Sequence, residues 1–135
     1  MSADDNKQLM MAAFAELAQG NSTHLRKLIA EDCRWNLIGT TPWSGANVGK
    51  QAIENFLASV DDRFTGPVVL TADRFIAEGD YMAVQFHGQA TTTEGRPYNN
   101  VYCWVCHMSD GQLREITEYA DTQLAMTTLF APSTQ

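Results

Sequence analysis

Polar side chains recur inside an otherwise apolar and aromatic stretch in the last third of the chain. Gln85, His87, Asn99 and Glu118 each stand among apolar or aromatic neighbours, where a strand of a plain core would carry Val or Leu. A carboxylate beside an imidazole can orient its tautomer and raise its basicity, and carboxamides can hold a water molecule or a carbonyl oxygen. The pattern therefore predicts a polar pocket able to do acid–base chemistry.

Two of these polar residues, together with Asn36 earlier in the chain, form the expected catalytic set. We expect His87 to act as the base, Glu118 as its orienting partner or as the proton donor, and Asn36 to position water or a carbonyl oxygen. Glu118 among apolar neighbours should have a raised pKa, which suits a proton donor. The alternative is that these groups only satisfy one another inside a core. Further expected contacts with the substrate are Gln85, Asn99 and Trp43, the last at the pocket mouth.

The elements that must position these residues follow from spacing and turn residues. Apolar periodicity predicts a first helix closed by Gly20, then helices at about 23–30 and 49–62, with a strand at 33–38 between the last two. Four strands follow, the first opened by Pro67. Asp110-Gly111 predicts a tight hairpin between the last two strands, because both central residues of such a turn need positive φ. This order indicates an α+β fold with helices packed on one face of a mostly antiparallel sheet.

The length, composition and charge of the chain limit the number of domains and the classes of partner that we expect. A chain of 135 residues with 44% hydrophobic residues is expected to form a single domain over 1–135. The net charge of −7 and the scattered Lys and Arg residues argue against a nucleic-acid partner. No apolar run approaches membrane-spanning length, and the acidic, polar N-terminus does not resemble a secretory signal. With an odd number of cysteines, 3, these features predict a cytoplasmic protein with no membrane partner.

One motif matches a haem-attachment pattern, namely Cys103-Trp-Val-Cys106-His107. The motif lies in an alternating strand, so Cys103 and Cys106 should point to opposite faces, where a single haem or metal ion cannot take both. We therefore expect no metal site and no cofactor. Cys33 is expected to be a small buried side chain.

Aromatic and methionine side chains also share a face. Tyr98, Tyr102 and Trp104 alternate along one strand, and Met82, Val84 and Phe86 along its neighbour. We expect this face to lie opposite the pocket, where it is too apolar to remain in water, and therefore to form a homodimer interface. The alternative is that the segment around Leu129 and Phe130 folds back over it.

Three local motifs resemble a known superfamily. They are residues 41–45 (TPWSG) with Gly49, residues 95–102 (GRPYNNVY), and Asp110-Gly111 leading to residues 118–122 (EYADT). Together with the element order they resemble the nuclear transport factor 2-like superfamily, in its polyketide cyclase (SnoaL-like) and ketosteroid-isomerase-related branch. The resemblance implies a cone-shaped domain with a hydrophobic pocket, in which three N-terminal helices pack on a curved sheet. It also implies a homodimer, since these cones commonly pair through the sheet.

The ketosteroid-isomerase residues do not carry over. The position that resembles their catalytic base is Leu37 or Asn36, and those that resemble their oxyanion-hole tyrosine and aspartic acid are Phe14 and Cys103. None can play the catalytic part, so we do not expect that activity, and Phe14 and Cys103 are left as substrate contacts.

The limonene-epoxide-hydrolase residues carry over in part. Asn36 and Glu118 match an asparagine and a carboxylate of that set, whereas the other carboxylate, the arginine and the tyrosine fall at His87, Gln85 and Arg34.

Two functional classes stay open, because this fold hosts enzymes and plain binding domains alike. The first is a small-molecule-binding isomerase, cyclase or hydrolase that uses His/Glu acid–base chemistry on a small, apolar, oxygenated substrate. The second is a non-catalytic ligand-binding or dimeric scaffold domain.

Overall fold

Four helices form around one sheet in the computed structural model, which describes residues 1–130. Helix α1 (Ala3–Leu17) starts at a capping box in which Ser2 and Asp5 satisfy each other's backbone N–H. Helices α2 (Thr23–Leu28) and α3 (Lys50–Asp61) follow the predicted positions. A fourth helix, α4 (Thr122–Leu129), is not anticipated by the spacing; the Asp121 side chain caps it by accepting from the Leu124 N–H at 3.1 Å.

The sheet has six strands in the order β2-β1-β6-β5-β4-β3. Within residues 1–130 only the β1–β6 pair is parallel, so the sheet is mostly antiparallel and the predicted α+β class is confirmed. The sequence did not predict strand β2, a short antiparallel partner of β1, because it directly follows a Gly- and Pro-rich loop. Strand β3 starts before Pro67, at Phe64. The strands are β1 (Ile29–Leu37), β2 (Gly45–Val48), β3 (Phe64–Glu78), β4 (Tyr81–Thr92), β5 (Val101–Ser109) and β6 (Gln112–Ala120).

The hairpin between β5 and β6 has the predicted turn but not an ideal register. Asp110 and Gly111 have φ of 54° and 72°, as the tight turn requires. Beside the turn Ser109 pairs with Gln112 and Met108 with Leu113, but the next pair is His107 with Glu115, so Arg114 is an extra, bulged residue. Beyond the bulge every residue of β6 is displaced by one position, which exchanges its two faces.

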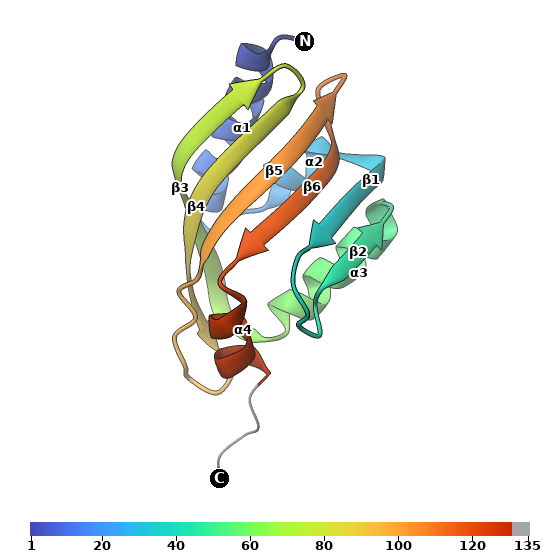
Figure 1. Ribbon diagram of the computed structural model, residues 1–135. Helices are drawn as coiled ribbons and strands as arrows, with labels where there is room; N and C mark the ends of the chain where they lie inside the picture. Colours follow the sequence, from blue (N-terminus) through green and yellow to red (C-terminus); the bar gives the residue numbers. More distant parts are fainter. Residues whose placement is uncertain (131–135) are drawn as a thin grey trace.

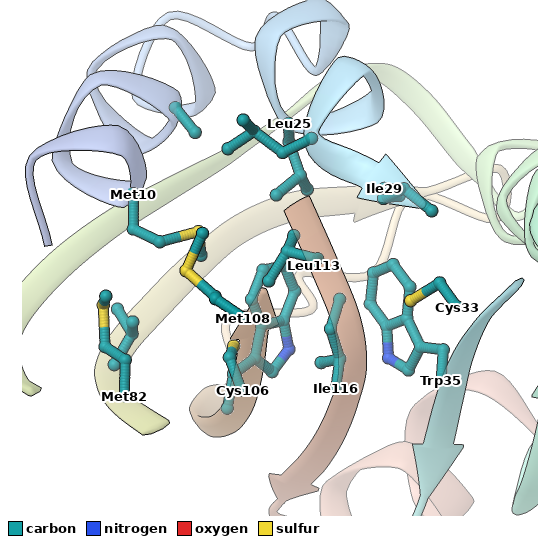
Figure 2. Packing of buried hydrophobic residues seen from close by; sticks show 14 of the residues in the cluster. Met10, Leu25, Ile29, Cys33, Trp35, Met82, Cys106, Met108, Leu113 and Ile116 are labelled. Atoms are coloured by element: carbon teal, nitrogen blue, oxygen red, sulfur yellow. The ribbon is translucent and has the colours of Figure 1, made fainter. Parts of the chain in front are cut away.

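The three N-terminal helices cover one face of the sheet, which we call the inner face (Figure 1). Figure 2 shows Met10 of α1 beside Met108 of β5, with Leu25 of α2 near Leu113 of β6. Burial of each such side chain contributes about 1.5–3 kcal/mol, so this packing decides which face turns toward the helices. Buried strand residues of the inner face include Met82, Val84, Phe86, Trp104, Cys106, Met108, Leu113 and Ile116.

The expected dimer face is therefore wrong. Phe86 and Trp104 are only 2% exposed and pack against Phe14 of α1 within the same chain, so they offer no surface to a second copy. The helices cover the apolar face of the sheet, because burying apolar surface is favourable while Gln85 and His87 gain from staying in water. No helix among residues 1–130 is long and apolar enough to cross a membrane.

Candidate functional site

A cavity of about 400 Å³ lies between the inner face of the sheet and the helices. Most of its wall is apolar, with Leu25 of α2, Leu57 of α3 and Leu70 of β3 among the lining residues. One set of polar or N–H-bearing groups comes from neighbouring strands: Trp35 of β1, Tyr98 before β5, Tyr102 and Trp104 of β5, and Glu118 of β6. The other polar lining residues are Ser22, Arg26, Thr41, Asp61, Gln89 and Thr122. An apolar cavity with a few convergent polar groups is the usual form of a small-molecule site.

Glu118 is the ionisable group that the sheet contributes to this cavity next to Trp104; Arg26 and Asp61, whose side chains are more exposed, also line it. It pairs directly with Trp104 across the β5–β6 ladder, and the Trp104 indole N–H donates to its Oε1 at 2.8 Å. Burial raises the pKa of Glu118 from 4.5 to about 7, and the Trp104 N–H opposes this rise by favouring the ionised form. The Trp35 indole also lowers the pKa of Glu118, as the Trp104 indole does. Its contact with Glu118 falls short of a hydrogen bond, and its buried Nε1 has no hydrogen-bond partner among residues 1–130.

Two tyrosine hydroxyls form a second polar group on the cavity wall. Nδ2 of the buried Asn100 donates to the Tyr98 hydroxyl at 2.7 Å, and the Tyr102 hydroxyl interacts more weakly with that of Tyr98. Burial raises the pKa of both tyrosines, and the charge of Glu118 raises both further, so both hydroxyls stay protonated at neutral pH. Gly88 makes room for this arrangement, because a Cβ there would lie 3.3 Å from the Tyr102 ring.

Aromatic side chains also line the cavity wall near α4. Trp43 lines the cavity and meets Phe56 and Phe130 edge-on, at centroid distances of 5.9 and 5.2 Å. The Arg63 guanidinium lies 5.2 Å from the centre of the Phe130 ring and donates to the Leu129 carbonyl at the end of α4, at 2.8 Å. These contacts fix α4, whose Ala125 also lines the cavity.

The structure does not bring His87 to Glu118. His87 and Gln85 lie on the outer face, away from the helices, where Nδ1 of His87 is 2.9 Å from a carboxylate oxygen of Asp73. The expectation of one cavity shared by Gln85, His87 and Glu118 is therefore wrong. The cause is the bulge at Arg114: an ideal two-residue hairpin would place Glu118 opposite Cys103, on the same face as His87, and the bulge places it opposite Trp104 instead.

The other expected site residues are scattered. Asn36 lies outside the cavity lining and accepts a hydrogen bond from Nε of Arg34 at 2.9 Å. Asn99 is exposed, and Cys103 pairs with Gln85 on the outer face. Phe14 is 3% exposed and packs in the core behind the cavity without lining it, so of the residues expected to bind substrate only Trp43 is on the cavity wall.

Sequence reasoning missed Tyr98, Tyr102, Trp35 and Trp104 as cavity residues. The alternation along β5 correctly put Tyr102 and Trp104 on one face. Their aromatic character predicts a subunit interface, whereas a pocket for an apolar molecule is also lined by aromatic residues. No pattern in the sequence separates these two uses.

The haem-like motif has the geometry expected of an alternating strand. Cys106 is buried on the inner face and Cys103 lies on the outer face, and both thiols are free. Within residues 1–130 no group of three or more His, Cys, Asp and Glu side chains lies close enough to hold a metal ion.

Comparison with known proteins agrees with this geometry. A family model described as the SnoaL-like domain matches residues 10–116. A nuclear transport factor 2-like protein of unknown function from Burkholderia pseudomallei superposes with a TM-score of 0.82 at 21% identity, over 97% of this chain and 100% of that one. A protein from Bacillus subtilis named as a candidate isomerase gives a TM-score of 0.80 at 17% identity, over 100% of both chains. TerC, co-crystallised with polyporic acid, gives 0.79 at 21% identity, over 93% of this chain and 98% of that one.

These structural likenesses show the fold. A search of curated protein sequences found no match.

Proposed function

The chain belongs to the SnoaL-like domain family, and we propose that it binds a small, largely apolar, oxygen-containing molecule in its cavity and transfers a proton there. Glu118 is the acid–base group of this proposal. The observation that carries it is the carboxyl group of Glu118 on the wall of an apolar cavity, with a pKa raised to about 7. A general acid or base is most effective when its pKa lies near the working pH.

A single carboxyl group with this pKa can serve in both directions. Near neutral pH roughly half of the molecules carry the carboxylate, which can accept a proton, and the other half the acid, which can return it. An isomerisation or a cyclisation requires that a proton is removed from one atom of the bound molecule and returned at another. The Trp104 N–H holds Oε1, so Oε2 is the atom left for the substrate.

The cavity wall supports the choice of ligand. Leucine and aromatic side chains dominate it, so a ligand gains most from burying apolar surface, while polar groups near Glu118 favour an oxygen at that end. The candidate isomerase and TerC with polyporic acid, both of the same fold, are consistent with small-molecule chemistry in such a cone.

Hydrogen exchange into a model ketone tests the proposal. 2-Tetralone, which is small, mostly apolar and carries acidic C–H groups beside its carbonyl, is incubated with the protein in D₂O and followed by NMR. We expect catalysed exchange with an inflection near pH 7, and a loss of roughly a hundred- to ten-thousand-fold in Glu118→Gln. The matched control is Glu115→Gln, which removes a carboxylate from the same strand but outside the cavity lining and should exchange like the wild type. Equal rates in Glu118→Gln and the wild type would remove Glu118 from the role.

A non-catalytic binding domain is the second candidate. It is favoured by one observation: among the described residues no histidine lines the cavity, so Glu118 has no imidazole beside it. Saturable binding of 2-tetralone without exchange above the solvent rate would support this function instead.

A further inference from the structure

We infer that Tyr98 and Tyr102 form a hydrogen-bond donor site for a carbonyl-type oxygen of the ligand, and that Asn100 is the residue that makes it a donor. The inference deepens the proposed function, on which its ligand class rests, by naming the chemical group recognised next to Glu118. It follows from the hydrogen bonds of the Asn100 side chain.

The orientation of the Asn100 side chain is fixed by the backbone. Its Oδ1 accepts from the N–H of Val101 at 2.7 Å and from the N–H of Asp121 at 3.2 Å, while its Nδ2 donates to the Asp121 carbonyl at 3.1 Å. A flipped amide would put an NH₂ group against two N–H donors and an oxygen against a carbonyl. The group that reaches Tyr98 is therefore Nδ2, which can only donate.

The hydroxyl of Tyr98 must consequently accept from Asn100 and cannot donate to it. The two tyrosine hydroxyls carry one hydrogen each. At most one of these hydrogens can form a hydrogen bond between Tyr98 and Tyr102, whichever of the two is the donor. Within residues 1–130 no other hydrogen-bond acceptor for either hydroxyl is found. At least one O–H is therefore left over, and both residues line the cavity.

The left-over hydrogen is well suited to bind a ligand oxygen. Because Tyr98 already accepts from Asn100, its own O–H is polarised and becomes a stronger donor. Both rings are held in place: Tyr98 stacks on Phe64 at 5.7 Å and Tyr102 stacks on Phe86 at 4.8 Å between centroids. An oxygen that only accepts, such as that of a ketone, matches this site, whereas the Glu118 carboxylate beside it would repel an anionic ligand.

Two matched probes measure the donor site. 2-Acetylnaphthalene carries a carbonyl oxygen and no polar hydrogen, and 2-ethylnaphthalene has nearly the same shape without the oxygen. We expect the wild type to bind the ketone several-fold to about tenfold more tightly than the hydrocarbon, which is the usual net worth of one hydrogen bond. With a ¹³C-labelled carbonyl, the infrared stretch of the bound ketone should lie below its value in a hydrocarbon solvent.

Phenylalanine variants keep the ring packing and remove the hydroxyls. The double variant Tyr98→Phe/Tyr102→Phe has no hydroxyl hydrogen left, so it should lose the preference for the ketone and the infrared shift, yet still bind the hydrocarbon. Each single variant retains one free O–H, so both should keep part of the shift. If the double variant does not fold, Tyr98→Phe decides the matter, because it removes the hydroxyl that Asn100 polarises and leaves only the Tyr102 hydroxyl. A carbonyl stretch that stays at its wild-type value in Tyr98→Phe would overturn the donor site.

Asn100→Asp tests the positioning role. The two backbone N–H groups that point at this side chain favour the ionised carboxylate, while the Asp121 carbonyl, which accepts from Nδ2 in the wild type, opposes it, so the test is made at pH 8. The ionised carboxylate would accept the Tyr98 hydrogen and take it away from the ligand. At pH 8 we expect a smaller infrared shift of the bound ketone in this variant. A shift equal to that of the wild type would show that Asn100 does not position the donor.

The outcomes separate this inference from the proposed function. A preference for the ketone that survives in the double variant, or its absence in the wild type, overturns the donor site even if Glu118 catalyses exchange. A tyrosine-dependent preference without exchange keeps the donor site and removes the acid–base role. Failure of the wild type to bind either probe overturns both.

Discussion

Trp104 and Glu118 are direct cross-strand partners, and the indole Nε1 of Trp104 lies 2.8 Å from Oε1 of Glu118. The pairing exists because one bulged residue, Arg114, turns Glu118 from the outer to the inner face. A carboxyl group in that position loses most of its hydration and keeps one strong donor. The chemistry of the cavity therefore depends on a backbone irregularity at Arg114, which lies near the turn of the hairpin and does not itself line the cavity.

Stability should fall as pH rises across the Glu118 titration. The folded-state pKa, about 7, exceeds the ordinary value of 4.5, so between these values the folded chain holds a proton that the unfolded chain has released. The contribution is fully present below pH 4.5 and is lost as the pH rises through 7. At about 1.36 kcal/mol per pKa unit the loss is roughly 3 kcal/mol. Urea unfolding at a series of pH values should show this slope in the wild type and in Glu115→Gln but not in Glu118→Gln.

Trp104→Phe should raise the pKa of Glu118 further. The variant keeps an aromatic ring in the core but removes the N–H that stabilises the carboxylate. ¹³C NMR of labelled glutamate should place the Glu118 midpoint above its wild-type value near 7. Trp35→Phe, which removes the weaker of the two indole effects, is the matched comparison and should give a smaller rise. An unchanged midpoint in Trp104→Phe would contradict the electrostatic account of the site.

His87→Gln should leave cavity function unchanged. His87 and its partner Asp73 have side chains 44% and 52% exposed on the outer face, and exposed ion pairs of this kind contribute at most about 1 kcal/mol. We expect wild-type affinity for 2-acetylnaphthalene, wild-type exchange of 2-tetralone and a small change in Tm. A large loss of exchange in this variant would return His87 to the mechanism.

A homodimer stays a prediction, and the outer face of the sheet is the surface left for it. Val101 and Tyr119 are 61% and 46% exposed there, on neighbouring strands that no helix covers (Figure 1). We predict that Val101→Glu/Tyr119→Glu dissociates the dimer in sedimentation experiments, because a charge buried in an interface without a partner is costly. Met11→Glu, at an exposed position of α1, is the control. A wild type that sediments as a monomer at micromolar concentration would refute the prediction.

The sequence by itself determined the local structure and the class of the fold. Apolar spacing at helical intervals located α1, α2 and α3, and Asp110-Gly111 located the last hairpin, because these depend on backbone conformation and on neighbours close in the chain. Alternation also showed which residues of β4 and β5 share a face. It correctly grouped Gln85 with His87 and Tyr102 with Trp104.

Only the tertiary structure decided which face is the inside and where Glu118 points. A pattern of period two defines two faces without saying which one the helices will cover, and here the gain from burying Phe86 and Trp104 against α1 outweighed any pocket built from Gln85 and His87. The bulge at Arg114 then moved Glu118 to the side opposite His87. A single extra residue leaves the alternating pattern of each strand recognisable, so the exchange of faces is visible only in the register of the folded sheet.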